Sequence, residues 1–190
     1  MTLLLAGMLL FIGAHSVSIV APRWRDGMVA RFGEQSWKGL YAVVSLVGFV
    51  MLILGYSAAR HSPVVLYLPP AWMRHLALAL MLPVFPLLIA TYLPGRISRA
   101  AKHPMLLATK VWATAHLLAN GMLAGVVLFG GLLAWAVADR ISLKRRPARP
   151  IPGAPPRSAN DLLAVVLGLL IYVAFVGALH EALFGVSPLP

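Results

Sequence analysis

The chain has 190 residues, of which 61% are hydrophobic and only 11% are charged, whereas a soluble domain carries about a quarter charged residues. Its formal net charge of +11 would indicate nucleic-acid binding in a soluble protein. Here the basic residues lie between long apolar segments, so we expect them to set membrane topology and to face anionic lipid, with no nucleic acid as a partner. The absence of cysteine excludes disulfides, iron–sulfur clusters and covalently attached haem, but leaves histidine-ligated cofactors open.

Five apolar segments predict helices that span a lipid bilayer. They cover residues 2–21, 40–59, 71–93, 104–138 and 162–184. Pro83 and Pro86 should kink the third segment, which neighbouring helices in a membrane tolerate. Pro104 suits the first turn of the helix that follows it. Ser158 and Asp161 have the spacing of a capping box, which predicts the start of the last helix.

The fourth segment is too long for one ordinary span and just long enough for two short ones. The strong turn dipeptide Asn120-Gly121 lies in its middle. Without a turn there, 8 basic residues would lie on each side of the membrane; with it, 14 lie on one side and 2 on the other, which is the asymmetry that membrane proteins show. We therefore predict an all-α, polytopic transmembrane helical bundle of about six helices, including a short hairpin that turns at Asn120-Gly121.

This count of helices also predicts where the parts of the chain lie. We expect a single transmembrane domain over residues 1–190 in a bacterial inner membrane, with both termini in the periplasm. The two halves of the hairpin have about 17 residues each and cover only ~25 Å, so the hairpin should turn below the outer surface. The proline-rich residues 145–157 should form a flexible cytoplasmic loop.

Two of the six histidines, His15 and His116, lie well inside apolar segments, where ionisable residues are costly and therefore candidates for function. Asn120 follows His116 by one helical turn and shares its face. One interpretation is a pair of interhelical hydrogen bonds. The other is a b-type haem with imidazole on both axial positions. The sequence places His15 and His116 about 8 Å apart in depth, which helix tilt can reduce.

The remaining histidines lie nearer the membrane surfaces. His103 precedes the fourth helix at the inner face, where it is either an interfacial residue or a contact to a haem propionate or a substrate. His61 is expected in a solvated outer loop, and His75 beside Arg74 should reach the interface. His180 lies near the outer end of the last helix, where interfacial anchoring is the default interpretation.

Two blocks of sequence resemble the NnrU family and its plant and cyanobacterial relative, zeta-carotene isomerase. The first is Gly13-Ala-His-Ser16 with the downstream Phe32-Gly-Glu-Gln-Ser-Trp-Lys-Gly-Leu-Tyr41, and the second is His103-Pro104 followed by Trp112-Ala-Thr-Ala-His-Leu-Leu-Ala-Asn-Gly121. The C-terminal Gly185-Val-Ser-Pro188 is also typical of NnrU proteins. The resemblance implies a haem b cofactor with His15 and His116 as its iron ligands, and His103 and Asn120 as nearby polar residues.

The resemblance leaves three functions open. NnrU proteins are associated with nitrite and nitric oxide metabolism, which implies a support or redox role with proteins of nitrogen-oxide pathways as partners. The isomerase implies a haem-dependent cis-trans isomerase acting on a hydrophobic, carotenoid-like polyene, although Ala113 stands where we expect a cysteine in that enzyme. The third hypothesis is a non-catalytic membrane scaffold. The sequence leaves open whether the chain is an enzyme.

Overall fold

The computed structural model describes residues 1–146, 149 and 151–189. Within these residues the regular secondary structure is helical, apart from an isolated β-bridge between Val65 and Met122, and loops connect the helices. The elements in chain order are α1 (Thr2–Val20), α2 (Pro22–Phe32), α3 (Glu34–Arg60), α4 (Trp72–Met81), α5 (Val84–Tyr92), α6 (Arg96–Ala101), α7 (Pro104–Ala119), α8 (Leu123–Ser142), α9 (Ala159–Ala174), the π-helix η1 (Phe175–Leu179) and α10 (His180–Phe184). The predicted all-α bundle is confirmed.

In the part of the chain that the structure describes, five helical segments are long and apolar enough to cross a membrane. They are α1, α3, α4 with α5, α8, and α9 with η1 and α10. The remaining long helix, α7, has 16 residues and is shorter than the ~20 residues of an ordinary span. Large apolar side chains such as Leu46 and Leu170, each 62% exposed, point away from the bundle, as lipid-facing residues do. The protein is therefore a multi-pass membrane protein.

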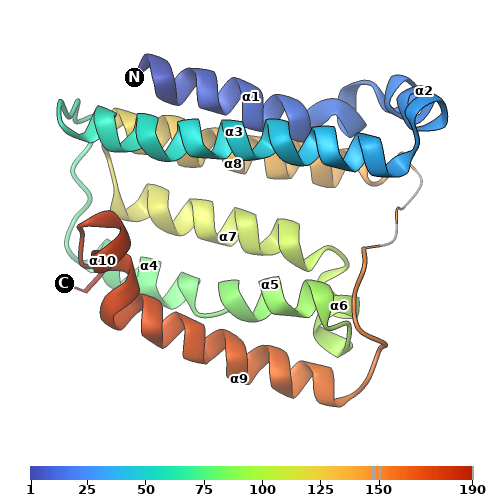
Figure 1. Ribbon diagram of the computed structural model, residues 1–190. Helices are drawn as coiled ribbons and strands as arrows, with labels where there is room; N and C mark the ends of the chain where they lie inside the picture. The colour runs from blue at the N-terminus through green and yellow to red at the C-terminus, as the bar shows by residue number, and fades with distance from the viewer. Residues whose placement is uncertain (147–148, 150, 190) are drawn as a thin grey trace.

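Helix α7 lies between two groups of helices (Figure 1). On one side it packs against α8, which packs against α1 and α3; on the other side it packs against α4 and α5, and α5 packs against α9. Both termini lie at one end of the bundle, while α2 and α6 lie at the other. We call the latter the basic end, because these two short helices carry Arg23, Arg31, Arg96 and Arg99.

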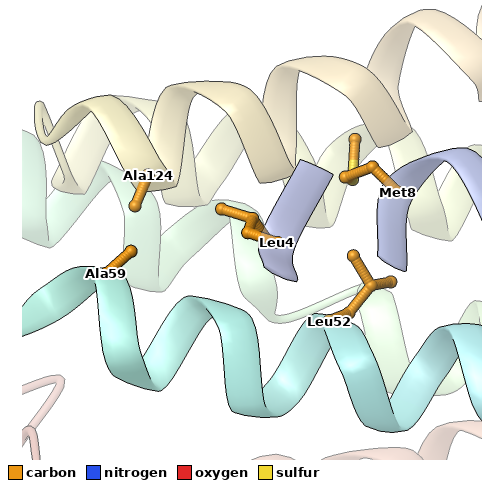
Figure 2. Packing of buried hydrophobic residues seen from close by; sticks show 5 residues of the cluster. All are labelled: Leu4, Met8, Leu52, Ala59 and Ala124. Atoms are coloured by element: carbon orange, nitrogen blue, oxygen red, sulfur yellow. The ribbon is translucent and has the colours of Figure 1, made fainter. Parts of the chain in front are cut away.

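Helices α1 and α3 pack closely against each other. A side chain added at Gly48 would meet the backbone of Phe11 at 2.7 Å, and one added at Gly55 would overlap the backbone of Leu4. Glycine at both positions lets the two backbones approach, as small residues commonly do between membrane helices. Helix α8 completes this core (Figure 2), in which Leu4, Met8, Leu52, Ala59 and Ala124 are buried together.

The predicted hairpin is confirmed: α7 ends at Ala119, and α8 begins at Leu123. The segment between α3 and α4 lies across its tip. Leu66 N–H donates to the carbonyl of Gly121 at 2.8 Å, and the Tyr67 hydroxyl donates to the carbonyls of Leu117 and Asn120. These bonds satisfy carbonyl groups that the end of α7 leaves free, which is essential where no water reaches.

Local sequence signals placed two further breaks correctly. The third apolar segment divides at Pro83 into α4 and α5, and Pro104 is the first residue of α7. The start of the last helix was predicted correctly, since α9 begins at Ala159 directly after Ser158, but the capping box itself does not form. Ser158 has helical φ and ψ and makes no side-chain cap, while Asp161 accepts hydrogen bonds from Arg96 N–H at 2.8 Å and Ile97 N–H at 2.9 Å. The carboxylate caps α6, a neighbouring helix, because α6 lies beside the start of α9.

Two further segments bear on the predictions. The start of α3 differs from the prediction, and the predicted loop over residues 145–157 lies partly outside the described residues. Helix α3 starts at Glu34, six residues before the apolar segment, because the amphipathic turn carrying the Lys38–Glu34 ion pair continues the helix beyond the membrane core. In the loop predicted over residues 145–157, residues 147, 148 and 150 lie outside the described residues. Within the described part, Arg149 donates to Asp26 at 2.9 Å and thereby joins this loop to α2.

Candidate functional site

Two imidazole rings meet near the end of the bundle that holds both termini. His116 lies in the last turn of α7, and His180 begins α10. Their ring centres are 6.4 Å apart and their planes differ by 30°. We call His116 and His180 the histidine pair.

Aromatic residues surround the pair. His116 lies 4.5 Å from the ring centre of Phe129, which is 5% exposed, and 4.9 Å from that of Trp112. Phe184 lies edge-on at 5.1 Å from His180. The pair therefore sits in an apolar environment in which few other groups compete for the imidazole nitrogens.

The position of His180 depends on a π-helical turn directly before it, over Phe175–Leu179. A π-helical turn adds a residue to a helix and rotates the residues that follow, and such turns often occur at functional sites. Helix α10 ends at Gly185, whose φ of 67° is in the left-handed region that favours glycine. The chain then turns back, so that the carbonyl of Val186 lies 2.7 Å from His180 Nδ1.

Both rings of the pair use Nδ1 to bind a backbone carbonyl. His116 Nδ1 lies 2.8 Å from the carbonyl of Trp112, and His180 Nδ1 lies 2.7 Å from that of Val186. Since a carbonyl only accepts, Nδ1 carries the proton in both rings. The neutral ring then presents Nε2 with a free lone pair, and metal-binding histidines are commonly oriented in this way.

His15 lies elsewhere, in an aromatic cluster formed by α1, α3 and α8. Its ring centre is 5.2 Å from that of Tyr41 and 5.6 Å from that of Trp135, and its Nδ1 lies 2.7 Å from the carbonyl of Phe11. Along α8, Trp135 and Phe129 are about 9 Å apart, so His15 and His116 contact this helix at different depths. The structure does not bring His15 into ring contact with His116.

The other two residues predicted near the cofactor, Asn120 and His103, lie in two different parts of the structure. Asn120 donates from Nδ2 to the hydroxyl of Tyr56 at 3.0 Å and accepts from Met122 N–H at 3.0 Å, so both ends of its side chain hold the hairpin turn. His103 precedes α7 at the basic end, about 20 Å along the helix from His116. Desolvation lowers the pKa of His103, and the charge of Arg140 lowers it further.

The pair suits a metal that brings most of its own ligands. No cluster of three or more His, Cys, Asp or Glu side chains that could hold a metal ion occurs in the described part of the chain. Haem needs only axial ligands from the protein. A bond from imidazole nitrogen to a metal such as zinc is about 2.0–2.1 Å, so the ring centres of two imidazoles that share one metal can be up to roughly 6 Å apart. The separation of 6.4 Å in the histidine pair fits this.

Sequence reasoning identified His116 but assigned His180 to interfacial anchoring. The signal that could have singled out His180 is the glycine five residues later, since a left-handed turn at Gly185 returns the chain toward the preceding helix. The π-helical turn has no clear signal in the sequence.

Comparison with known proteins identifies a family. The family model described as NnrU protein matches residues 3–188, nearly the whole chain. No curated protein and no solved structure matches the chain.

Proposed function

Since this chain belongs to the NnrU protein family, we propose that it is a haem b-binding member of that family, with a support or redox role in nitrite and nitric oxide metabolism. The observation that carries the haem proposal is the histidine pair, whose ring centres lie 6.4 Å apart. Its partners would then be proteins of nitrogen-oxide pathways in the same membrane.

His116 and His180 would hold the haem through their imidazole nitrogens. The resemblance implied His15 opposite His116, but the geometry supports His180 better, because His15 packs against Tyr41 and Trp135 instead. The carbonyls of Trp112 and Val186 keep the Nδ1 protons in place and leave both Nε2 atoms as ligands. When bound, haem supplies one-electron redox chemistry.

The aromatic residues around the pair would control that chemistry. Trp112, Phe129 and Phe184 contact the imidazoles and lower the polarity around them. Low polarity and the hydrogen bonds to axial ligands are two of the means by which a protein sets a haem potential. This is the contribution that the chain itself makes to a redox role.

Absorption spectra of the detergent-purified protein test the haem site. Cells supplied with a haem precursor should yield wild-type protein with a Soret band and sharp α and β bands after dithionite reduction. His116→Ala and His180→Ala should each lose the bis-histidine spectrum, while His15→Ala and the loop variant His61→Ala should keep it. A folded, colourless wild-type protein would contradict haem binding. Loss of the spectrum in His15→Ala but not in His180→Ala would instead support the pair implied by the resemblance.

The metabolic role requires a separate measurement. In a denitrifying host that lacks the chain, nitrite or nitric oxide consumption should fall and should be restored by the wild-type gene but not by His116→Ala. Unchanged consumption in the deletion strain would contradict the role and leave the haem site as a separate question.

We further propose a bacterial inner-membrane location with both termini in the periplasm. Both termini lie at the end of the bundle opposite the basic end (Figure 1), and basic loops normally remain in the cytoplasm. Alkaline phosphatase fused after the C-terminus should be active, and green fluorescent protein fused there should be dark. The reverse pattern would overturn this orientation.

A further inference from the structure

A hollow of ≈ 180 Å³ opens at the basic end of the bundle, where α6 faces the loop before α9 and the first turn of α9. The residues that line it include Arg96, Arg99 and Arg157, together with Ser158 and Asp161. We call Arg96, Arg99 and Arg157 the arginine triad. Two of the arginines come from α6 and the third from the loop before α9, so only the folded chain places them around one space.

The positive charge of the arginine triad is available to bind a ligand. Asp161 is the only carboxylate in the lining, and its two oxygens already accept from the backbone N–H groups of Arg96 and Ile97. Among the described residues the guanidinium groups of the triad make no hydrogen bond or ion pair within the chain. Three guanidinium groups carry up to five donors each and bind phosphate oxygens in pairs.

Exposed apolar side chains follow directly beyond the hollow along α9. Leu162 is 67% exposed, Leu163 is 47% exposed and Val166 is 46% exposed. A ligand whose anionic group enters the hollow can therefore lay a hydrocarbon chain along α9. A free phosphate ion would make no use of this apolar surface.

We propose that the arginine triad is a binding site for the phosphate headgroup of an anionic phospholipid, with the acyl chains on the exposed face of α9. Basic pockets at the cytoplasmic side of membrane proteins bind such headgroups. The site is independent of the histidine pair, which lies toward the opposite end of the bundle. Its effect would be to fix the junction of α5, α6 and α9 against the membrane surface.

Native mass spectrometry of the full chain in a mild detergent tests the site, with cardiolipin, phosphatidylglycerol and phosphatidylcholine titrated separately. The wild type should bind the two anionic lipids more tightly than phosphatidylcholine. The triple variant Arg96→Gln, Arg99→Gln, Arg157→Gln should bind cardiolipin about a hundredfold more weakly, since each basic residue near a membrane surface contributes about a factor of five. The contacts of Asp161 with α6 involve backbone N–H groups, so these substitutions leave them in place.

A matched triple variant, Arg23→Gln, Lys144→Gln, Arg145→Gln, removes the same charge outside the hollow and should retain wild-type binding. If both triple variants lose affinity equally, general attraction between charges explains the binding and the site is overturned. Equal affinity of the wild type for all three lipids would also overturn it. Displacement of cardiolipin by inorganic phosphate at equal concentration would show a free-anion site and overturn the assignment to lipid. Because Arg157 lies in an exposed loop, the single variant Arg157→Gln repeats the test if the triple variant does not fold.

Discussion

Arg60, the last residue of α3, donates a hydrogen bond from Nη1 to the carbonyl of Phe184, the last residue of α10, at 2.7 Å. This bond joins the ends of two helices whose residues are 124 positions apart in sequence. The bond fixes the turn that follows α10. In this turn the carbonyl of Val186, two residues after Phe184, accepts a hydrogen bond from Nδ1 of His180. Arg60 therefore acts on the histidine pair through the C-terminal turn.

Arg60→Leu should weaken haem retention about tenfold without abolishing it, because residues behind a metal ligand typically contribute 10–100-fold to affinity. Haem loss to apomyoglobin, followed by absorbance, measures this. Arg74→Leu, which removes the other basic residue predicted on the same side of the membrane, serves as the control and should have no effect. Equal haem loss from wild type and Arg60→Leu would show that the C-terminal turn holds His180 without this bond.

Gly55→Ala should destabilise the protein by about 1–3 kcal/mol or more, the usual cost of overpacking. The added methyl group would overlap the backbone of Leu4, which no side-chain rotation relieves. The control is Gly39→Ala on the same helix, where nothing lies within 4 Å. Thermal unfolding in detergent should show a lower midpoint for Gly55→Ala alone; a midpoint equal to that of Gly39→Ala would refute the close approach of α1 and α3.

Tyr67→Phe should lower stability by about 1–3 kcal/mol, because it leaves the carbonyls of Leu117 and Asn120 without their hydroxyl donor. The effect should appear as faster hydrogen exchange at the end of α7. Tyr92→Phe removes an exposed hydroxyl and should change neither quantity. Unaltered exchange in Tyr67→Phe would mean that the hairpin tip is satisfied by other donors.

His103 should titrate below the ordinary histidine pKa of 6.5, because desolvation and then the charge of Arg140 lower its pKa. The unfolded chain then binds a proton more readily than the folded one, so the contribution of His103 to stability falls as the pH drops through about 6.5. Histidine-selective ¹⁵N NMR in micelles gives the midpoint. Arg140→Gln should raise the pKa of His103 only part of the way to 6.5, since the desolvation of the imidazole remains. A wild-type midpoint at or above 6.5 would contradict the effect.

Much of the fold could be read from the sequence because its signals are local. Hydropathy marks each span, since a lipid-facing helix must be apolar over its whole length. Pro83, Pro104 and Asn120-Gly121 act on the backbone at their own positions, and the structure breaks or starts helices at each of them. His116 could be singled out for the same reason, since an imidazole within an apolar segment is costly wherever the helix packs. The isomerase and scaffold hypotheses remain predictions.

Only the tertiary structure decided which groups meet. The imidazole that lies near His116 is that of His180, 64 residues later, because a π-helical turn and the returning C-terminal segment place it there. Asp161 has the spacing of a local cap but binds α6, because α6 lies within reach of its carboxylate. Spacing along a helix fixes which side chains share a face. The neighbour of that face depends on packing between segments far apart in the chain, and a pattern within one segment does not encode it.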